Sequence, residues 1–145
     1  MTGMRLVVVG VDGSACSREA LRFAIEESRL RDAHLKIVTA WTVPATAYAG
    51  MFSPGIDPTL FEEDAAAEST KALEDARELA PDVQIDATTH NGSAAAALIS
   101  AAGDADLLVV GSRGHGGFTG LLLGSVSQQL AEHAPCPVAI IHATA

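Results

Sequence analysis

Glycines recur through residues 104–128, which read DADLLVVGSRGHGGFTGLLLGSVSQ. An apolar run from Leu107 to Val110 leads directly into Gly111, and the pair Gly124-Ser125 opens a predicted helix. Glycines let consecutive N–H groups converge on one point, and a helix N-terminus adds about half a positive charge. This order of strand, glycine loop and helix start predicts an anion site, with phosphate as its natural ligand.

Neither of two common phosphate motifs fits these glycines. A P-loop requires Lys after G-x4-G, and Gly117 stands at that position behind Gly111 and Gly116. The dinucleotide fingerprint, begun at Gly114, fails because Thr119 occupies its third glycine position. What remains is the pattern G-x2-G-x9-G-S, and the alternative interpretation is a flexible surface loop without a ligand.

A carboxylate, Asp12, follows the first predicted strand in the segment GVDGS. Ligands of open parallel sheets bind beyond the carboxyl ends of the strands where the strand order reverses, so Asp12 is expected to face the glycine loop. A carboxylate there repels a polyphosphate unless it binds a ribose hydroxyl, or a Mg²⁺ shared with the phosphates directly or through water. The alternative is that Asp12 caps the following helix, and the two roles can coexist.

Other residues near the expected crevice carry weaker signals. An adenine base is expected to contact backbone groups at the end of the second strand, Val38 to Ala40. Arg113 and His115 are the cationic candidates in the glycine loop; Arg113 is a candidate phosphate contact, and a solvent-facing role is open to both. Cys16 is interpreted as a small residue near a helix start rather than as a redox group.

Apolar runs alternate with helical patterns along the chain, which is typical of a parallel sheet covered on both faces. The predicted strands are Arg5 to Val11, Leu35 to Trp41, Val83 to Thr89, Ala105 to Val110 and Val138 to His142. The third strand alternates polar and apolar residues and therefore suits a sheet edge. These features predict an open, Rossmann-like α/β fold with five parallel strands in the order 3-2-1-4-5.

Helices are predicted between these strands. They run from about Ser17 to Arg31, from Asp57-Pro58 to Leu79, from Ser93 to Ala102 and from Ser125 to a point before Pro135. The predicted inner face of the first helix holds Leu21, Ala24, Ile25 and Ser28. The carboxylates of the second helix are predicted to face solvent. Ser93 is predicted to begin the third helix, and Gly103 to end it. The segment from Thr42 to Pro58 is predicted to be a long loop, either a lid or disordered.

The composition fits one cytoplasmic domain spanning residues 1–145. A chain of this length buries about two-thirds of its unfolded surface in a single core. Cys16 and Cys136 lack metal-binding spacing, the histidines are scattered, and no segment resembles a signal peptide, so reduced thiols and no zinc site are expected. The apolar runs are too short to cross a bilayer, and the net charge of −9 opposes binding to nucleic acids and anionic membranes.

Together these segments resemble the ATP-binding branch of the universal stress protein family. The resemblance spans nearly the whole chain through VVVGVDGS, GSRGHGGFTGLLLGSVS and HAPCPVAII. It implies that ATP, commonly with Mg²⁺ at Asp12, is held by residues at three strand ends and at the start of the last helix. These are Gly10, Val11, Asp12, Val38, Thr39, Ala40, Gly111, Ser112, Arg113, Gly114, His115, Gly116, Gly124, Ser125, Val126 and Ser127. It also implies a homodimer through the last strand, Val138 to His142, which agrees with the tendency of an apolar edge strand to associate.

Three functions follow from these observations. The leading hypothesis is an ATP-binding regulatory module of the stress response with little turnover. The first alternative is a weak ATPase or phosphate-transfer enzyme; phosphoryl transfer needs a positioned nucleophile and concentrated positive charge, and the chain offers Asp12, Arg113 and a metal without an evident base. The second alternative is a nucleotide-free dimeric interaction scaffold, against which the intact glycines argue.

Overall fold

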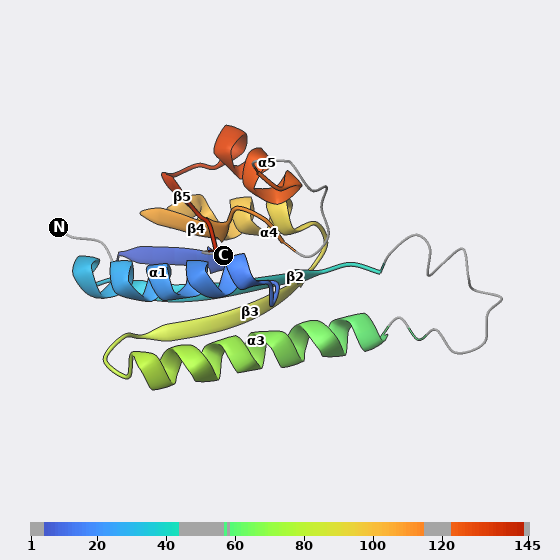
Figure 1. The fold of residues 1–145 in the computed structure, drawn as a ribbon, viewed down its shortest axis with the longest axis horizontal. Helices are drawn as coiled ribbons and strands as arrows, with labels where there is room; N and C mark the ends of the chain where they lie inside the picture. Colours follow the sequence, from blue (N-terminus) through green and yellow to red (C-terminus); the bar gives the residue numbers. More distant parts are fainter. Residues whose placement is uncertain (1–4, 44–56, 58, 115–122, 144–145) are drawn as a thin grey trace.

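Five parallel strands form one sheet in the order β3-β2-β1-β4-β5, as the sequence predicts (Figure 1). The computed structural model describes residues 5–43, 57, 59–114 and 123–143. The strands are β1 (Leu6–Gly10), β2 (His34–Trp41), β3 (Ile85–Asn91), β4 (Leu107–Gly111) and β5 (Val138–Ile141). Because β1 pairs with β2 on one side and with β4 on the other, the strand order reverses between β1 and β4.

Turn hydrogen bonds move two strand boundaries from their predicted places. β3 begins at Ile85 rather than Val83, because the Val83 N–H still donates to the Ala80 carbonyl at 3.1 Å. β4 begins at Leu107 rather than Ala105, because the Ala105 N–H donates to the Ala102 carbonyl at 3.0 Å. Both segments are therefore still turning where their apolar residues suggest a strand.

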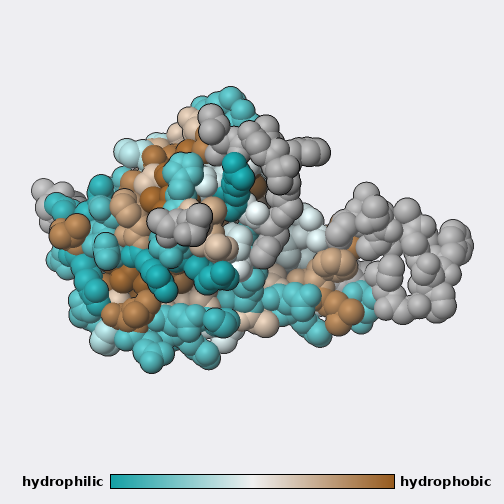
Figure 2. All heavy atoms as spheres, in the orientation of Figure 1, coloured by the Kyte–Doolittle hydropathy of each residue, from teal (hydrophilic) through white to brown (hydrophobic). Residues whose placement is uncertain are grey.

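Helices cover both faces of the sheet (Figure 1). α1 (Ala15–Arg31) and α3 (Thr59–Leu79) pack on one face, and α4 (Ala94–Ala101) and α5 (Ser125–His133) pack on the other. The predicted inner face of α1 is confirmed, since Leu21, Ala24, Ile25 and Ser28 are all buried. The surface along α3 is mainly hydrophilic, as expected for its many carboxylates (Figure 2). Within the described residues, no helix combines the length and apolar character needed to cross a membrane.

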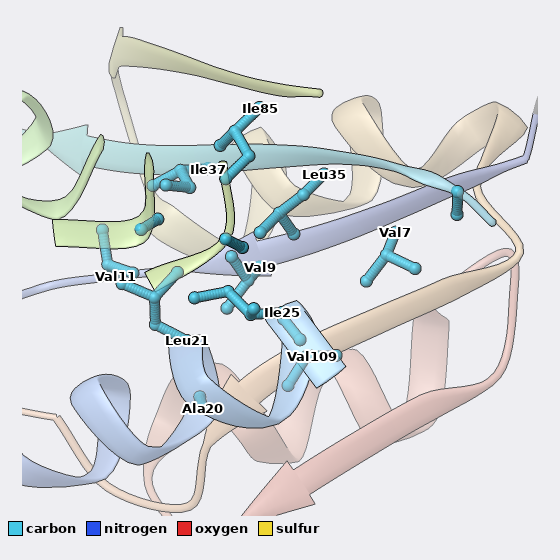
Figure 3. Packing of buried hydrophobic residues seen from close by; sticks show 14 of the residues in the cluster. Val7, Val9, Val11, Ala20, Leu21, Ile25, Leu35, Ile37, Ile85 and Val109 are labelled. Carbon is cyan, nitrogen blue, oxygen red and sulfur yellow. The ribbon is translucent and has the colours of Figure 1, made fainter. Parts of the chain in front are cut away.

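The side chains of β1 lie at the centre of the core, where Val7, Val8 and Val9 are completely buried. Side chains along a strand alternate between the two faces of a sheet. Val7 and Val9 therefore pack toward α1 (Figure 3), whereas Val8 packs with Leu98 of α4 and Leu130 of α5. Burial on both faces explains why this strand is a continuous apolar run.

The ends of α4 and the start of α3 test the predicted caps. Ser93 caps α4 as predicted, because its side chain accepts a hydrogen bond from the Ala96 N–H at 3.1 Å. The prediction that Gly103 ends this helical segment is wrong, since the 3-10 turn η1 (Ala102–Asp104) continues through it. Asp57 accepts the Thr59 N–H at 3.0 Å, and hydrogen bonds from the Thr59 backbone and hydroxyl lower the pKa of its carboxyl. The predicted loop from 42 to 58 otherwise lies outside the described residues, apart from residues 42 and 43.

Candidate functional site

A cleft of about 360 Å³ opens at the carboxyl ends of β1, β2 and β4. It lies where the strand order reverses, the place that the predicted topology favours for a ligand. The first turns of α1, α4 and α5 all contribute to its wall. The described lining residues are Gly10, Val11, Asp12, Ser17, Val38, Ala40, Ala94, Leu98, Val110, Gly111, Ser112, Arg113, Gly114, Leu123, Gly124, Ser125, Val126, Ser127 and Gln128.

The start of α5 holds the chain that leaves β4. The Ser112 carbonyl accepts hydrogen bonds from the Gly124 N–H at 2.7 Å and from the Ser127 hydroxyl at 3.0 Å. The Ser127 hydroxyl also lies 3.1 Å from the Gly124 carbonyl and is buried. Ser127 therefore has its hydroxyl engaged within the protein, and its backbone N–H is the group it can offer to a ligand.

The start of α1 contacts the same segment. The Ser14 hydroxyl donates to the Arg113 carbonyl at 3.4 Å, and the Cys16 Sγ lies 3.7 Å from the Ser112 Oγ. Burial raises the pKa of the Cys16 thiol, but hydrogen bonds from the Ser112 hydroxyl and from backbone groups of Ala143 and Arg113, with the charge of Arg113, outweigh it. The net result is a Cys16 pKa below its ordinary value, at a partly exposed position behind the cleft.

The N-terminus of α5 has no side-chain cap. Its N-cap residue is Gly124, whereas Ser14 and Ser93 accept N–H hydrogen bonds at the starts of α1 and α4. The first N–H groups of α5, at residues 125–127, therefore receive no acceptor from the cap position, and these residues line the cleft. These N–H groups and the partial positive charge of the helix end favour an anion.

Asp12 approaches the glycine loop from the end of β1. Its Oδ1 accepts the Ser14 N–H at 2.9 Å, and a Cβ built on Gly114 would overlap its Oδ2. The proximity of Asp12 to the glycine loop, expected from the topology, is therefore present. The alternative that Asp12 caps α1 is wrong, because Ser14 occupies the N-cap position and accepts the Ser17 N–H at 3.2 Å.

Most of the residues proposed from sequence surround this cleft. Those among its described lining are Gly10, Val11, Asp12, Val38, Ala40, Gly111, Ser112, Arg113, Gly114, Gly124, Ser125, Val126 and Ser127. Thr39 is not, because alternation along β2 turns its buried side chain to the face of Leu35 and Ile37, beneath α1 and α3. The Val38 carbonyl accepts the Val11 N–H at 3.0 Å, so this predicted base contact is already part of the sheet. His115 and Gly116 lie outside the described residues.

The cleft also contains residues that the sequence analysis missed. They are Ser17, Ala94, Leu98, Val110, Leu123 and Gln128. Ala94 and Leu98 come from α4, which follows the edge strand β3 and has no glycine or charged residue to mark it. The signal that could have found them is topological, since every helix that follows a parallel strand begins at the carboxyl edge of the sheet.

Few charged groups face the cleft. Asp12 is the single carboxylate and Arg113 the single cation among its described lining residues. In the described ranges, no three His, Cys, Asp or Glu side chains come together as a metal site. Asp12 alone therefore suits a Mg²⁺ that is also bound by ligand phosphates, rather than a metal bound by protein groups only.

Comparisons with known proteins show the family of the chain. The model of the universal stress protein family matches residues 4–142 of the chain. A universal stress protein from Mycolicibacterium smegmatis is 35% identical over 137 residues, which cover 93% of this chain and 45% of that protein. The chain thus spans about half the length of the curated relatives it matches.

Two solved structures illustrate the likeness in three dimensions. A universal stress protein in complex with cAMP is 30% identical with a TM-score of 0.70, over 99% of this chain and 100% of the other. A universal stress protein from Archaeoglobus fulgidus in complex with dAMP is 21% identical with a TM-score of 0.65, over 97% and 99% of the two chains. The second likeness concerns the fold alone.

Proposed function

Because the chain belongs to the universal stress protein family, we propose that its cleft binds ATP and that the protein is a nucleotide-dependent regulatory module of the stress response. The observation that carries this proposal is the start of α5, where N–H groups without a side-chain cap line the cleft beside Gly114 and Gly124. The 30% identical structure in complex with cAMP supports an adenine nucleotide as the ligand. The phosphates would lie against the first turn of α5 and the segment 111–114.

Asp12 and Arg113 are proposed to act on the phosphate end of the nucleotide. Asp12 Oδ2 lies beside Gly114, so a Mg²⁺ shared by this carboxylate and the phosphates would remove the repulsion between the two negative groups. Arg113 is exposed at the same end of the cleft and suits a phosphate oxygen. Asp12 would hold the Mg²⁺, which would supply positive charge against the phosphates.

We expect ATP turnover to be slow. Phosphoryl transfer is fast where a nucleophile is positioned and positive charge surrounds the transferred group. The described lining offers one carboxylate, whose Oδ1 accepts the Ser14 N–H, and one cation. Regulation by occupancy therefore fits the cleft better than efficient catalysis.

The last strand is proposed to join two copies of the chain. β5 lies at an edge of the sheet, and its side chains from Val138 to Ile141 are all half-buried. The carbonyls of Pro137 and Ile141 accept hydrogen bonds from β4 and the residue after it. The backbone groups of the alternate residues, Val138, Ile140 and His142, therefore face away from the sheet. Ala139 also packs against the core cluster under α1, so circular dichroism must first show that Ala139→Glu is folded. The folded variant should give a weaker homodimer in analytical ultracentrifugation, whereas Thr89→Glu on the opposite edge strand should not; a persistent dimer of the Ala139 variant would place the interface elsewhere.

The remaining proposals concern the setting of the protein. We propose that residues 1–145 act as one domain in the cytoplasm, with no nucleic acid or membrane partner. Cys16 and Cys136 are free thiols, which suits a reducing compartment. The net charge of −9 repels phosphate backbones and anionic lipids.

Titration of MgATP into nucleotide-stripped protein by calorimetry tests the function, with Gly124→Ala as the control. A Cβ on Gly124 would lie 3.4 Å from the Ser112 carbonyl oxygen and 3.8 Å from the Gly114 nitrogen, and its φ of −74° suits Ala. The fold should therefore persist, while the methyl group occupies space beside the phosphate-binding N–H groups. We expect saturable binding near one ATP per chain, weakened at least about tenfold in the variant, as for one lost charge-assisted hydrogen bond. Failure of the unaltered protein to bind would contradict the function; equal affinities would place the phosphates elsewhere.

A further inference from the structure

The cleft has an apolar part that lies outside the glycine pattern. Ala94 and Leu98, one helical turn apart on α4, line it together with Val38 and Ala40 from β2 and Val110 from β4. α4 and α5 pack against each other on the same face of the sheet. The cleft therefore lies between two helices: α5 contributes the N–H groups of its uncapped first turn, and α4 contributes the apolar residues Ala94 and Leu98.

Tight packing fixes the depth of this apolar part. Leu98 is 3% exposed and belongs to the core cluster with Val8 and Val38. A Cβ on Gly10 would lie 2.8 Å from Leu98 Cδ1, so the missing side chain of Gly10 is what lets Leu98 pack against the end of β1. Leu98 consequently forms the buried floor of this part of the cleft, whereas Ala94 lies one turn earlier, half-buried, at the start of the helix.

We propose that Ala94 is a specificity-determining residue, whose small side chain leaves the space on α4 that the base of a bound nucleotide occupies. This inference rests on the proposed function and assigns the base to the α4 side of the cleft. Phosphate contacts are common to every phosphorylated ligand, so discrimination must come from the part of the cleft that receives the base. An apolar wall with little polar lining suits the flat face of a purine ring. The binding free energy becomes more favourable in proportion to the apolar area that the ring buries.

The substitution Ala94→Leu is designed to fill this space while every residue of the α5 start and of the segment 111–114 stays unchanged. Ala96→Leu is the matched control, since Ala96 is exposed on the same helix and does not line the cleft. Calorimetry with AMP and with inorganic tripolyphosphate separates the two parts of the cleft. We expect Ala94→Leu to lower the affinity for AMP at least about tenfold and to leave that for tripolyphosphate within about twofold, with Ala96→Leu unchanged for both.

Circular dichroism and thermal unfolding establish that both variants are folded. Ala94→Val adds a smaller side chain than Ala94→Leu, and we expect it to lose AMP affinity to an intermediate extent. Equal AMP affinities of the Ala94→Leu and Ala96→Leu proteins would overturn the inference while the proposed function stands. Parallel loss of AMP and tripolyphosphate in folded Ala94→Leu protein would overturn it too, because Ala94 would then act on the phosphate end. Failure of the unaltered protein to bind any nucleotide would instead overturn the proposed function, and this inference with it.

Discussion

Gly111 lies directly against Cys16 in the first turn of α1. A Cβ built on Gly111 would stand 2.7 Å from the Cys16 Cβ and 2.8 Å from the Cys16 carbonyl carbon. Real Cβ atoms do not approach other carbons this closely, and backbone atoms of a helix cannot turn aside as the end of a flexible side chain can. Gly111 therefore allows α1 to pack against the end of β4, a structural requirement that exists before any ligand binds.

The substitution Gly111→Ala is accordingly predicted to destabilise the fold. Overpacking at a buried contact of this kind costs about 1–3 kcal/mol in the free energy of unfolding. Urea denaturation measures the loss, and Gly103→Ala is the control because a Cβ there meets no atom within 4 Å. Equal stability of the Gly111 and Gly103 variants would show that α1 is not packed as described. Reduced nucleotide affinity of the Gly111 variant alone says little about phosphate contacts, which is why Gly124 is the better position for that test.

Ser14 is predicted to contribute both to stability and to the cleft. It is the N-cap of α1 and also donates to the Arg113 carbonyl at 3.4 Å. Ser14→Ala should cost about 1 kcal/mol in the free energy of unfolding, as for other lost caps, and should also weaken ATP binding several-fold. Ser93→Ala removes a comparable cap from α4 and should show a similar stability loss; because it leaves the segment after β4 in place and affects only the α4 start beside Ala94, it should weaken ATP binding less than Ser14→Ala does. Thermal unfolding and calorimetry on both variants measure the two effects; the same ATP affinity in both would mean that Ser14 does not position the segment after β4.

Local sequence patterns were sufficient to predict the fold and the lining residues of the cleft that come from the ends of β1 and β4 and from the start of α5. The apolar runs of β1 and β4 indicate strands that are buried on both faces of the sheet. Because these strands are parallel, their carboxyl ends lie at the same edge of the sheet. Asp12 and Gly114 could therefore be placed together, although more than 100 residues separate them, from the strand order alone. Period-two alternation along β2 was also enough to place the side chains of Thr39 and Val38 on opposite faces of the sheet, although the prediction for Val38 to Ala40 concerned their backbone groups.

Contacts between distant helices could not be predicted in this way. The fit of Leu98 over Gly10 depends on how α4 packs across the sheet, and no residue spacing encodes it. The contact of Gly111 with α1 could not be predicted either. A sequence does not distinguish a glycine that is needed for helix packing from one that is needed to bind a phosphate. Capping is intermediate: Ser93 was correctly predicted, whereas at α1 the sequence analysis considered Asp12, and only the hydrogen bonds identify Ser14 as the cap.

The two cysteines are predicted to differ in reactivity. The pKa of Cys16 lies below its ordinary value, whereas burial and then the negative charge of Asp106 raise the pKa of Cys136. Because the thiolate is the nucleophile, Cys16 should be alkylated faster by iodoacetamide near neutral pH. The advantage of Cys16 should shrink as the pH rises through the pKa of Cys136 and both thiols ionise. Mass spectrometry of samples alkylated between about pH 7 and 10 measures both sites in one protein; equal rates at every pH would contradict the predicted order.

The substitution Asp12→Asn is predicted to abolish the dependence of ATP affinity on Mg²⁺. Asn retains an oxygen that can accept the Ser14 N–H, so the turn before α1 should persist. Asp12 Oδ2 lies beside Gly114, at the end of the cleft assigned to phosphates rather than on the α4 side assigned to the base, which favours a shared Mg²⁺ over a ribose hydroxyl. Unaltered protein should therefore bind ATP more tightly with Mg²⁺ than with EDTA, and the variant should bind equally in both. Calorimetry under the two conditions measures this difference. A loss of affinity of the same size with and without Mg²⁺ would instead assign Asp12 to the ribose, and single-turnover phosphate release unchanged by the substitution would exclude Asp12 from any residual hydrolysis.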